Sequence, residues 1–361
     1  MKKGAALVFV AAGVSQESLI RRAKKMGFYC IGVDKNPDAP GFKWCDERIV
    51  ASTHQFAEID EPLRSLVGDL EVVGVINRSA GLPVIVSSQI SRSLSLPSID
   101  PLAARTLVEK DRLRRACVEL DIPTPDFSLL PEHSQIISQD LGLPLVVKPA
   151  VSMVGKSGIT KVEEICALHG AVSEAKLLSL NKAVILEEFL PGKDFSLFCF
   201  VAGDQFEPVC LMEELNSFGT DNKVVAQGYR TATHSDRERY IDSAISIAAA
   251  IVAGFSIKYS NLMVSLRVDS EDRLKLVEVH LDIGADLLIE EVFSRALNFD
   301  YIEATIKNAI GDEKNLPSKV EVRPTAIFYE NGRGLIRERG FKIFSADSDE
   351  ALEKKIAKAK I

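Results

Sequence analysis

The sequence predicts a mixed α/β and α+β protein in which a parallel sheet precedes a part built mainly from hairpins. In the first hundred residues short apolar strands alternate with helices, and later apolar segments are separated by glycine loops and tight turns. The chain has 361 residues, 46% of them hydrophobic and 26% charged. At roughly 100–200 residues per domain, this length predicts two or three domains with well-developed cores.

The formal net charge of −7 argues against non-specific binding to nucleic acid or to anionic membranes. No apolar stretch approaches the roughly 20 residues of a membrane span. The basic and apolar start can mimic a signal peptide, but the turn and helix predicted over Gly13–Arg22 favour a buried first strand. None of the six cysteines forms a C-x-x-C pair, which predicts reduced thiols in a cytoplasmic protein.

Three apolar segments predict the strands of the N-terminal parallel sheet, which are Ala6–Val10, Tyr29–Val33 and Val72–Ile76. The residues that follow them, Gly13, Asp34 and Asn77-Arg78, are expected to line one crevice at the carboxyl ends of the strands. The turn after the first strand lacks the G-x-G-x-x-G pattern, so it predicts an ordinary βα turn rather than a dinucleotide site.

Prolines and polar turns predict the elements that follow. Leu96–Pro101 is a boundary, a single basic helix is expected over about Leu102–Leu120, and Asp236–Gly254 predicts a long helix. Further predicted elements are a hairpin of Asn261–Val268 with Leu274–Leu281, a second hairpin at Asn331-Gly332 and a terminal helix.

A lysine ends one apolar strand and precedes a loop of small residues. Lys148 follows Leu145–Val147, and the loop begins at Val151 and leads into another strand. A lysine supplies a point charge for phosphate oxygens, and glycines let backbone N–H groups approach them. The loop lacks the upstream glycine of a Walker A sequence. Taken alone, the segment fits either polyphosphate binding or a surface hairpin with a solvated lysine.

Acidic residues flank a short connector between two later strands. Glu187 and Glu188 end the strand that begins at Val184, and Asp194 opens the next one. The connector can present backbone groups to a purine edge, and Asp194 can accept hydrogen bonds from ribose hydroxyls. A turn with solvated acids explains the same residues when they are taken alone.

Three polar residues alternate with apolar ones on a further predicted strand. Glu278, His280 and Asp282 therefore share one face. Because burial of three such groups is costly without a cation or a polar network, a hard divalent ion would satisfy them.

In this order and spacing, these segments resemble the ATP-grasp superfamily over most of the chain. The resemblance implies a Rossmann-like domain at residues 1–100 and a two-lobed ATP-grasp domain at 101–312, with a small lobe at about 122–195. Residues 313–361 would form a C-terminal lobe, which ends either as a truncated αβ unit or as a last helix.

The resemblance also assigns the contacts with ATP. Lys110 and Lys148 would bind phosphates, and the loop Val151–Ser157 would cover them. Glu187, with the backbones of Glu188 and Leu190, would face the adenine, and Asp194 would bind the ribose. The expected ATP-contacting residues are Lys110, Lys148, Ser152, Gly155, Ser157, Glu187, Glu188, Leu190 and Asp194.

The metal site implied by the resemblance departs from the family pattern. Glu278 would bind Mg²⁺, with Mn²⁺ as an alternative, and His280 stands where the family usually has a metal-binding Asn. Counting across the hairpin places Met263, or a neighbour such as Asn261 or Ser265, where a second acid is usual, and Asp282 replaces a common Arg. Three outcomes stay open: an unusual site completed by His280 or Asp282, one weakly held metal, or ATP binding without turnover.

The implied activity is an ATP-dependent ligase that activates a small carboxylate as an acylphosphate for attack by an amine. Lys148 and Arg230 are the expected catalytic residues, since the guanidinium fork of Arg230 matches a carboxylate or phosphoryl group. The alternatives are a carboxylase-like or purine-pathway-like ATP-grasp enzyme and an ATP-binding protein without ligase activity. The expected partners are ATP, a carboxylate and an amine, without nucleic acid or membrane, and a homodimer is compatible with the family.

Overall fold

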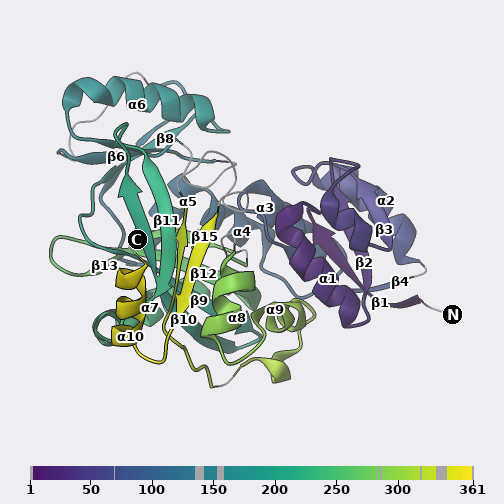
Figure 1. Cartoon of the computed structure of the whole chain (residues 1–361). Helices are drawn as coiled ribbons and strands as arrows, with labels where there is room; N and C mark the ends of the chain where they lie inside the picture. The colour runs from purple at the N-terminus through teal and green to yellow at the C-terminus, as the bar shows by residue number, and fades with distance from the viewer. Residues whose placement is uncertain are drawn as a thin grey trace.

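A computed structural model describes residues 3–68, 70–134, 142–152, 158–281, 283–284, 287–317, 319–330 and 340–359. It contains a four-stranded parallel sheet, a four-stranded antiparallel sheet and a seven-stranded antiparallel sheet. In Figure 1 the parallel sheet lies on the right, and the smaller antiparallel sheet lies under α6 at the upper left. Within the described ranges, no helix is both long and apolar enough to cross a membrane.

The N-terminal sheet is parallel, as the sequence predicted, with the order β3-β2-β1-β4. Its strands are β1 (Lys3–Val10), β2 (Tyr29–Asp34), β3 (Glu47–Val50) and β4 (Leu70–Asn77). Its helical segments are η1 (Val14–Gln16), α1 (Glu17–Lys25), η2 (Pro40–Trp44), α2 (Phe56–Val67) and α3 (Leu82–Ser93). Alternate residues of β1 face opposite layers: Ala6 and Val8 pack with α2 and α3, whereas Leu7 and Phe9 pack with α1.

The smaller antiparallel sheet has the order β5-β8-β6-β7. Its elements are β5 (Phe127–Leu130), β6 (Leu145–Pro149), β7 (Thr160–Val162), β8 (Val184–Glu188) and the helix α6 (Ile165–Leu178). Leu168 and Ala175 of α6 are buried against Val147 and Leu186 of the strands, which gives this sheet a core of its own.

The large sheet has the order β13-β12-β9-β10-β11-β14-β15. Its strands are β9 (Asp194–Ala202), β10 (Gln205–Phe218), β11 (Val224–Thr231), β12 (Tyr259–Val268), β13 (Leu274–His280), β14 (Thr325–Tyr329) and β15 (Phe341–Ser345). Both predicted hairpins pair antiparallel, as β12 with β13 and β14 with β15, although Asn331-Gly332 lies outside the described residues.

Helices cover the two faces of the large sheet differently. The long helix α7 (His234–Gly254) packs Tyr240, Ala244 and Ile247 against one face, together with α4 (Pro101–Val108) and α5 (Lys110–Glu119). A second core lies on the other face of the large sheet. The segments that pack there include η3 (Leu288–Val292), α8 (Phe293–Ala296) and α9 (Tyr301–Ala309). The last helical segments are η4 (Glu313–Asn315) and α10 (Asp349–Lys358).

The single helix expected over Leu102–Leu120 is wrong, because the chain breaks at Glu109. Asp100 caps α4 by accepting hydrogen bonds from the N–H groups of Leu102 and Ala103. Glu109 is extended, with φ −85° and ψ 111°, and it ends α4 and begins α5. The break lets the backbone N–H of Lys110 donate to the carbonyl of Ala150 at 3.0 Å, directly after β6.

Candidate active site

A buried carboxylate lies between two buried cations where the smaller sheet meets α5. The Lys148 Nζ and Glu187 Oε2 atoms are 2.5 Å apart, and Arg114 Nε donates to Glu187 Oε1 at 2.8 Å. Lys148 is 7% exposed, Glu187 1% and Arg114 0%, so the cluster is shielded from water. Lys148 and Glu187 reach each other because β6 and β8 are adjacent antiparallel strands.

Burial and ion pairing shift the pKa values of Glu187 and Lys148 in opposite directions. Burial alone would raise the pKa of Glu187, but Arg114 and Lys148 outweigh it and lower that pKa to about 2. Burial lowers the pKa of Lys148 from its ordinary value, and the charge of Glu187 opposes that change only in part. Glu187 therefore stays ionised, as a fixed negative charge beside Lys148.

Arg114 also connects this cluster to the large sheet. Its Nη2 donates to the carbonyl oxygen of Val277 on β13 at 2.7 Å. Arg114 was not predicted as a site residue, although it lies four residues after Lys110 and therefore on the same face of α5. That spacing is the signal that would have revealed it.

Lys110, which is buried, forms a second ion pair with Glu278 of β13, which is partly exposed. The Lys110 Nζ and Glu278 Oε1 atoms are 2.8 Å apart, and His280 Nε2 lies 3.7 Å from Glu278 Oε2. Burial would raise the pKa of Glu278, but Lys110 and His280 lower it, and Lys148 adds to this effect. Lys148 is close enough for its charge to act on Glu278, so the two lysine–carboxylate pairs belong to one electrostatic site.

The site continues across one face of the large sheet. Glu278 pairs in register with Ser265 of β12, and Ser265 pairs with Ser196 of β9, so these side chains share a face. Ser196 Oγ donates to Glu214 Oε1 at 2.5 Å. Glu214 was not predicted as a site residue, because β10 lacks a motif that would have drawn attention to it.

Asp194, the residue expected to bind the ribose, lies near the row of side chains formed by Glu278, Ser265, Ser196 and Glu214. Asp194 Oδ2 accepts a hydrogen bond from Asn216 Nδ2 at 3.0 Å, and Arg267 Nη1 lies 3.4 Å from Asp194 Oδ1. Asn216 Nδ2 also contacts Glu214 Oε2 at 3.4 Å, which links Asp194 to the row that ends at Glu278.

The hairpin register identifies the residues opposite the expected metal ligands. Met263 lies opposite His280 and Ser265 opposite Glu278, so neither position supplies a second acid. Within the described residues, no three His, Cys, Asp or Glu side chains gather in a group that could hold a metal. One carboxylate does fit a Mg²⁺ ion whose other ligands are phosphate oxygens and water.

The whole chain superposes on ligase structures at low sequence identity. It matches an L-amino acid ligase from Bacillus licheniformis with a TM-score of 0.80 and 15% identity over 99% of this chain and 97% of that one. A carboxyaminoimidazole ribonucleotide synthase from Aspergillus clavatus in complex with ATP matches with a TM-score of 0.75 and 15% identity over 99% of this chain and 97% of that one. The chain therefore has the ATP-grasp fold that these structures share.

Curated proteins match parts of the sequence. A D-alanine–D-alanine ligase from Nitrosococcus oceani is 37% identical over 115 residues, which are 31% of this chain and 34% of the relative. A phosphoribosylamine–glycine ligase from Lactococcus lactis is 24% identical over 241 residues, which are 64% and 58% of the two chains. The chain therefore spans about a third to somewhat over half of these relatives, and no protein-family model matches it.

The ATP-grasp residues expected in the flexible loop are only partly described. Ser152 lines a small cavity with Lys110, Glu278 and His280, whereas Gly155 and Ser157 lie outside the described residues. Asp282, which the sequence places beside the metal site, also lies outside them.

The structure describes all residues of the connector between β8 and β9, which is expected to face the purine. Glu188 Oε1 accepts a hydrogen bond from the backbone N–H of Asp126, and its carboxylate is paired with Lys275. Leu190 is buried. The backbone positions assigned to the purine therefore lie beside β8, next to Glu187.

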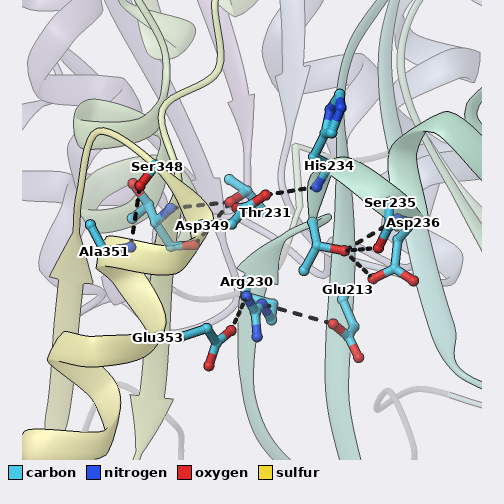
Figure 2. A network of polar contacts seen from close by, with 12 residues as sticks. Glu213, Arg230, Thr231, His234, Ser235, Asp236, Ser348, Asp349, Ala351 and Glu353 are labelled. Carbon is cyan, nitrogen blue, oxygen red and sulfur yellow. Dashed lines mark hydrogen bonds and ion pairs between the residues drawn. The ribbon is translucent and has the colours of Figure 1, made fainter.

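Arg230, expected to be catalytic, lies apart from this candidate site. Its cross-strand partner is Glu213, which pairs in turn with Phe195, so Arg230 faces α7 on the side of the sheet opposite Glu278. Figure 2 shows Arg230 between Glu213 and Glu353 of α10, with Arg230 Nη2 2.5 Å from Glu353 Oε1. The structure thus contradicts the expectation that Arg230 joins the lysines, because a one-residue step along β11 reverses the face to which a side chain points.

Proposed function

We propose that the chain is an ATP- and Mg²⁺-dependent ligase that activates a carboxylate as an acylphosphate for attack by an amine. The observation that carries the proposal is the convergence of two lysine–carboxylate pairs, the partly exposed Lys110–Glu278 pair and the buried Lys148–Glu187 pair, within an ATP-grasp fold. Such a site offers two cations for a triphosphate and one carboxylate for its metal. The partial relatives, whose names describe ligases, support this reading.

The lysines would position the triphosphate and neutralise its charge. Phosphoryl transfer requires little covalent work from the protein, so fixed charges near the transferred group account for most of the catalysis. Glu187 and Arg114 hold Lys148 in place, which reduces the reorganisation needed when the nucleotide binds. Lys110 begins α5 and is fixed by its backbone as well as by Glu278.

Glu278 would be the main protein ligand of the metal, with His280 beside it. Bound Mg²⁺ would supply charge neutralisation at the phosphate oxygens. Lys110 is paired with Glu278 in this structure. When ATP and metal bind, this ion pair would have to separate, so that Lys110 contacts phosphate and Glu278 contacts the metal.

The domain limits, the oligomeric state and the cellular location were also predicted from the sequence. The domain limits at residues 100 and 312 stay predictions from the sequence, and the separate core of the smaller antiparallel sheet supports the small lobe at 122–195. The homodimer and the cytoplasmic location stay predictions from the sequence.

Binding of an ATP analogue with Mg²⁺ tests the nucleotide site. Lys148→Gln removes the cation while Arg114 still pairs with Glu187, so the analogue should bind about tenfold or more weakly. Lys258→Gln is the matched control, because Lys258 is an exposed lysine paired with Asp204 away from the site. Equal affinity of the wild type and Lys148→Gln would remove Lys148 from the site.

Phosphate release from ATP, screened with carboxylates and amines, tests the reaction. Release that requires both a carboxylate and an amine supports the ligase. Release stimulated by bicarbonate would instead indicate a carboxylase-like acceptor, and tight ATP binding without release under any condition would indicate a nucleotide-binding protein.

A further inference from the structure

His280 brings a nitrogen atom to the position proposed for the metal. Its Nε2 lies 3.7 Å from Glu278 Oε2, whereas Lys110 is paired with the other oxygen of the same carboxylate, Oε1. Glu278 and His280 are two residues apart on β13, so their side chains point to the same face of the strand. One oxygen and one nitrogen therefore face each other at this place.

Both side chains can be reached from the candidate site. The side chain of Glu278 is 29% exposed and that of His280 is 20% exposed, and both residues line the small cavity that also contains Lys110 and Ser152. Within the described residues, the imidazole of His280 makes no hydrogen bond. Its Nε2 is therefore available to an ion that enters the cavity.

The separation of the two atoms fits a single ion. Bonds from a divalent ion to a carboxylate oxygen or an imidazole nitrogen are about 2.1 Å long. Two such ligands lie about 3.0 Å apart when they are at right angles and about 4.2 Å apart when they are opposite. The observed 3.7 Å falls between these limits, so Glu278 and His280 can bind one ion without a rearrangement of β13.

An imidazole ligand changes which ion a site prefers. Mg²⁺ is a hard cation that takes oxygen ligands and gives up its water reluctantly. Imidazole suits first-row transition ions, whose affinity for sites with nitrogen ligands rises from Mn²⁺ through Co²⁺ to Cu²⁺. This difference comes from the nitrogen atom itself, whatever the number of carboxylates around the ion.

We propose that Glu278 and His280 bind a first-row transition-metal dication in preference to Mg²⁺, and that His280 sets this preference. The inference rests on the proposed ligase function, which places the metal–ATP complex beside Glu278. It refines the metal of that proposal, because Mg²⁺ would still bind through oxygen ligands, but more weakly. Phosphate oxygens and water would complete the coordination.

Calorimetric titration with the Co²⁺ and Mg²⁺ complexes of a non-hydrolysable ATP analogue tests the preference. We expect the wild type to bind the Co²⁺ complex about tenfold more tightly than the Mg²⁺ complex. His280→Asn offers an amide oxygen in place of the imidazole nitrogen, so the ratio of the two affinities should fall to about one. Equal affinities in the wild type, or a ratio that His280→Asn leaves unchanged, would overturn the proposal.

Pulsed EPR of the Mn²⁺ complex detects the nitrogen ligand directly. A nitrogen nucleus bound to Mn²⁺ modulates the electron spin echo at frequencies that differ between ¹⁴N and ¹⁵N. We expect ¹⁴N modulation in the wild type and its replacement by ¹⁵N modulation when only histidine is labelled. This comparison needs no variant, so it decides the matter even if His280→Asn does not fold. Absence of a histidine nitrogen from the Mn²⁺ complex would refute the proposal.

A histidine–glutamate pair on the surface supplies the matched control. His234, at the start of α7 (Figure 2), has its Nε2 3.2 Å from Glu238 Oε1, and both side chains are 69% exposed. His234→Asn makes the same substitution there and should keep both the metal preference and the nitrogen modulation. Loss of the modulation in His234→Asn, and not in His280→Asn, would place the ion on the surface and overturn the proposal.

The same samples separate this inference from the ligase function. Failure of both metal complexes to bind would count against the nucleotide site, and the EPR comparison of the two variants can then use Mn²⁺ alone. Tight binding of both complexes without a metal preference would refute the role of His280 and leave the nucleotide site intact.

Discussion

Glu187 is the residue on which the charge balance of the candidate site depends. Its two carboxylate oxygens hold Lys148 and Arg114, and all three groups are buried. A buried ion pair contributes little net stability compared with apolar residues, but removal of one partner leaves the other charge uncompensated. Loss of Glu187 should therefore cost more than loss of either cation.

Glu187→Gln should lower the free energy of unfolding by about 3–5 kcal/mol, because two buried cations lose their carboxylate. Glu188→Gln is the neighbouring control and should cost about 0–1 kcal/mol, since the Glu188–Lys275 pair is partly exposed. Denaturant unfolding of both variants measures the difference. Similar losses in the two variants would contradict the central position of Glu187.

The low pKa of Glu187 also predicts an acid dependence. The folded-state pKa of about 2 lies below the ordinary value of 4.5, so the stabilisation is complete above about pH 4.5 and is lost as the pH falls through 2. The unfolding free energy of the wild type should fall between these pH values more steeply than that of Glu187→Gln. Parallel pH profiles, measured by denaturant unfolding, would show that Glu187 titrates normally.

At the scale of elements, the β12–β13 hairpin decides the composition of the metal site. Its register places Met263 opposite His280, on the same face as Glu278. Met263 is 5% exposed and belongs to the core on that face, so an apolar side chain occupies a place where a carboxylate would reach the site.

Met263→Glu should therefore tighten Mg²⁺ binding, because the affinity of a hard cation rises with the number of carboxylate ligands. We expect Mg²⁺ to raise the Tm of this variant more than that of the wild type. Met263→Gln, with similar length and no charge, should lack the gain. If Mg²⁺ shifts both variants equally, the two strands do not present these side chains to one site.

The sequence predicted these strands better than the helices beside them. Apolar alternation locates β13 and its acidic face, and the polar turn after β12 indicates the hairpin. The break between α4 and α5 escaped prediction, because Glu109 is a good helix former that becomes extended only through the contact of Lys110 with Ala150. Arg230 was misplaced for a related reason: a strand in a sheet covered on both faces does not reveal which face holds the site.

At the scale of the whole molecule, an ion pair between a buried arginine and a partly exposed glutamate joins the first sheet to a segment more than two hundred residues later. Arg78, at the end of β4, contacts both carboxylate oxygens of Glu290 in η3, at 2.5 and 3.0 Å. The sequence placed Asn77-Arg78 at the crevice of the parallel sheet, but Glu290 belongs to no local motif. Its role comes only from tertiary structure.

Arg78→Leu alone should destabilise the protein by about 1–3 kcal/mol, because the partly exposed Glu290 would lose its charge-assisted hydrogen bonds to Arg78. The double variant Arg78→Leu/Glu290→Leu should recover part of that loss. A double-mutant cycle by chemical denaturation should give a coupling of about 1–3 kcal/mol. Additive losses would mean that the pair does not join the two parts energetically.

The attachment of Lys110 has a practical consequence for experiments on this protein. Its backbone amide holds the start of α5 to the segment after β6, while its ammonium group carries the charge. Truncation of the side chain to alanine leaves the amide anchor in place. Kinetics of Lys110→Ala would thus report the electrostatic contribution of this lysine, separately from the tether between the two lobes.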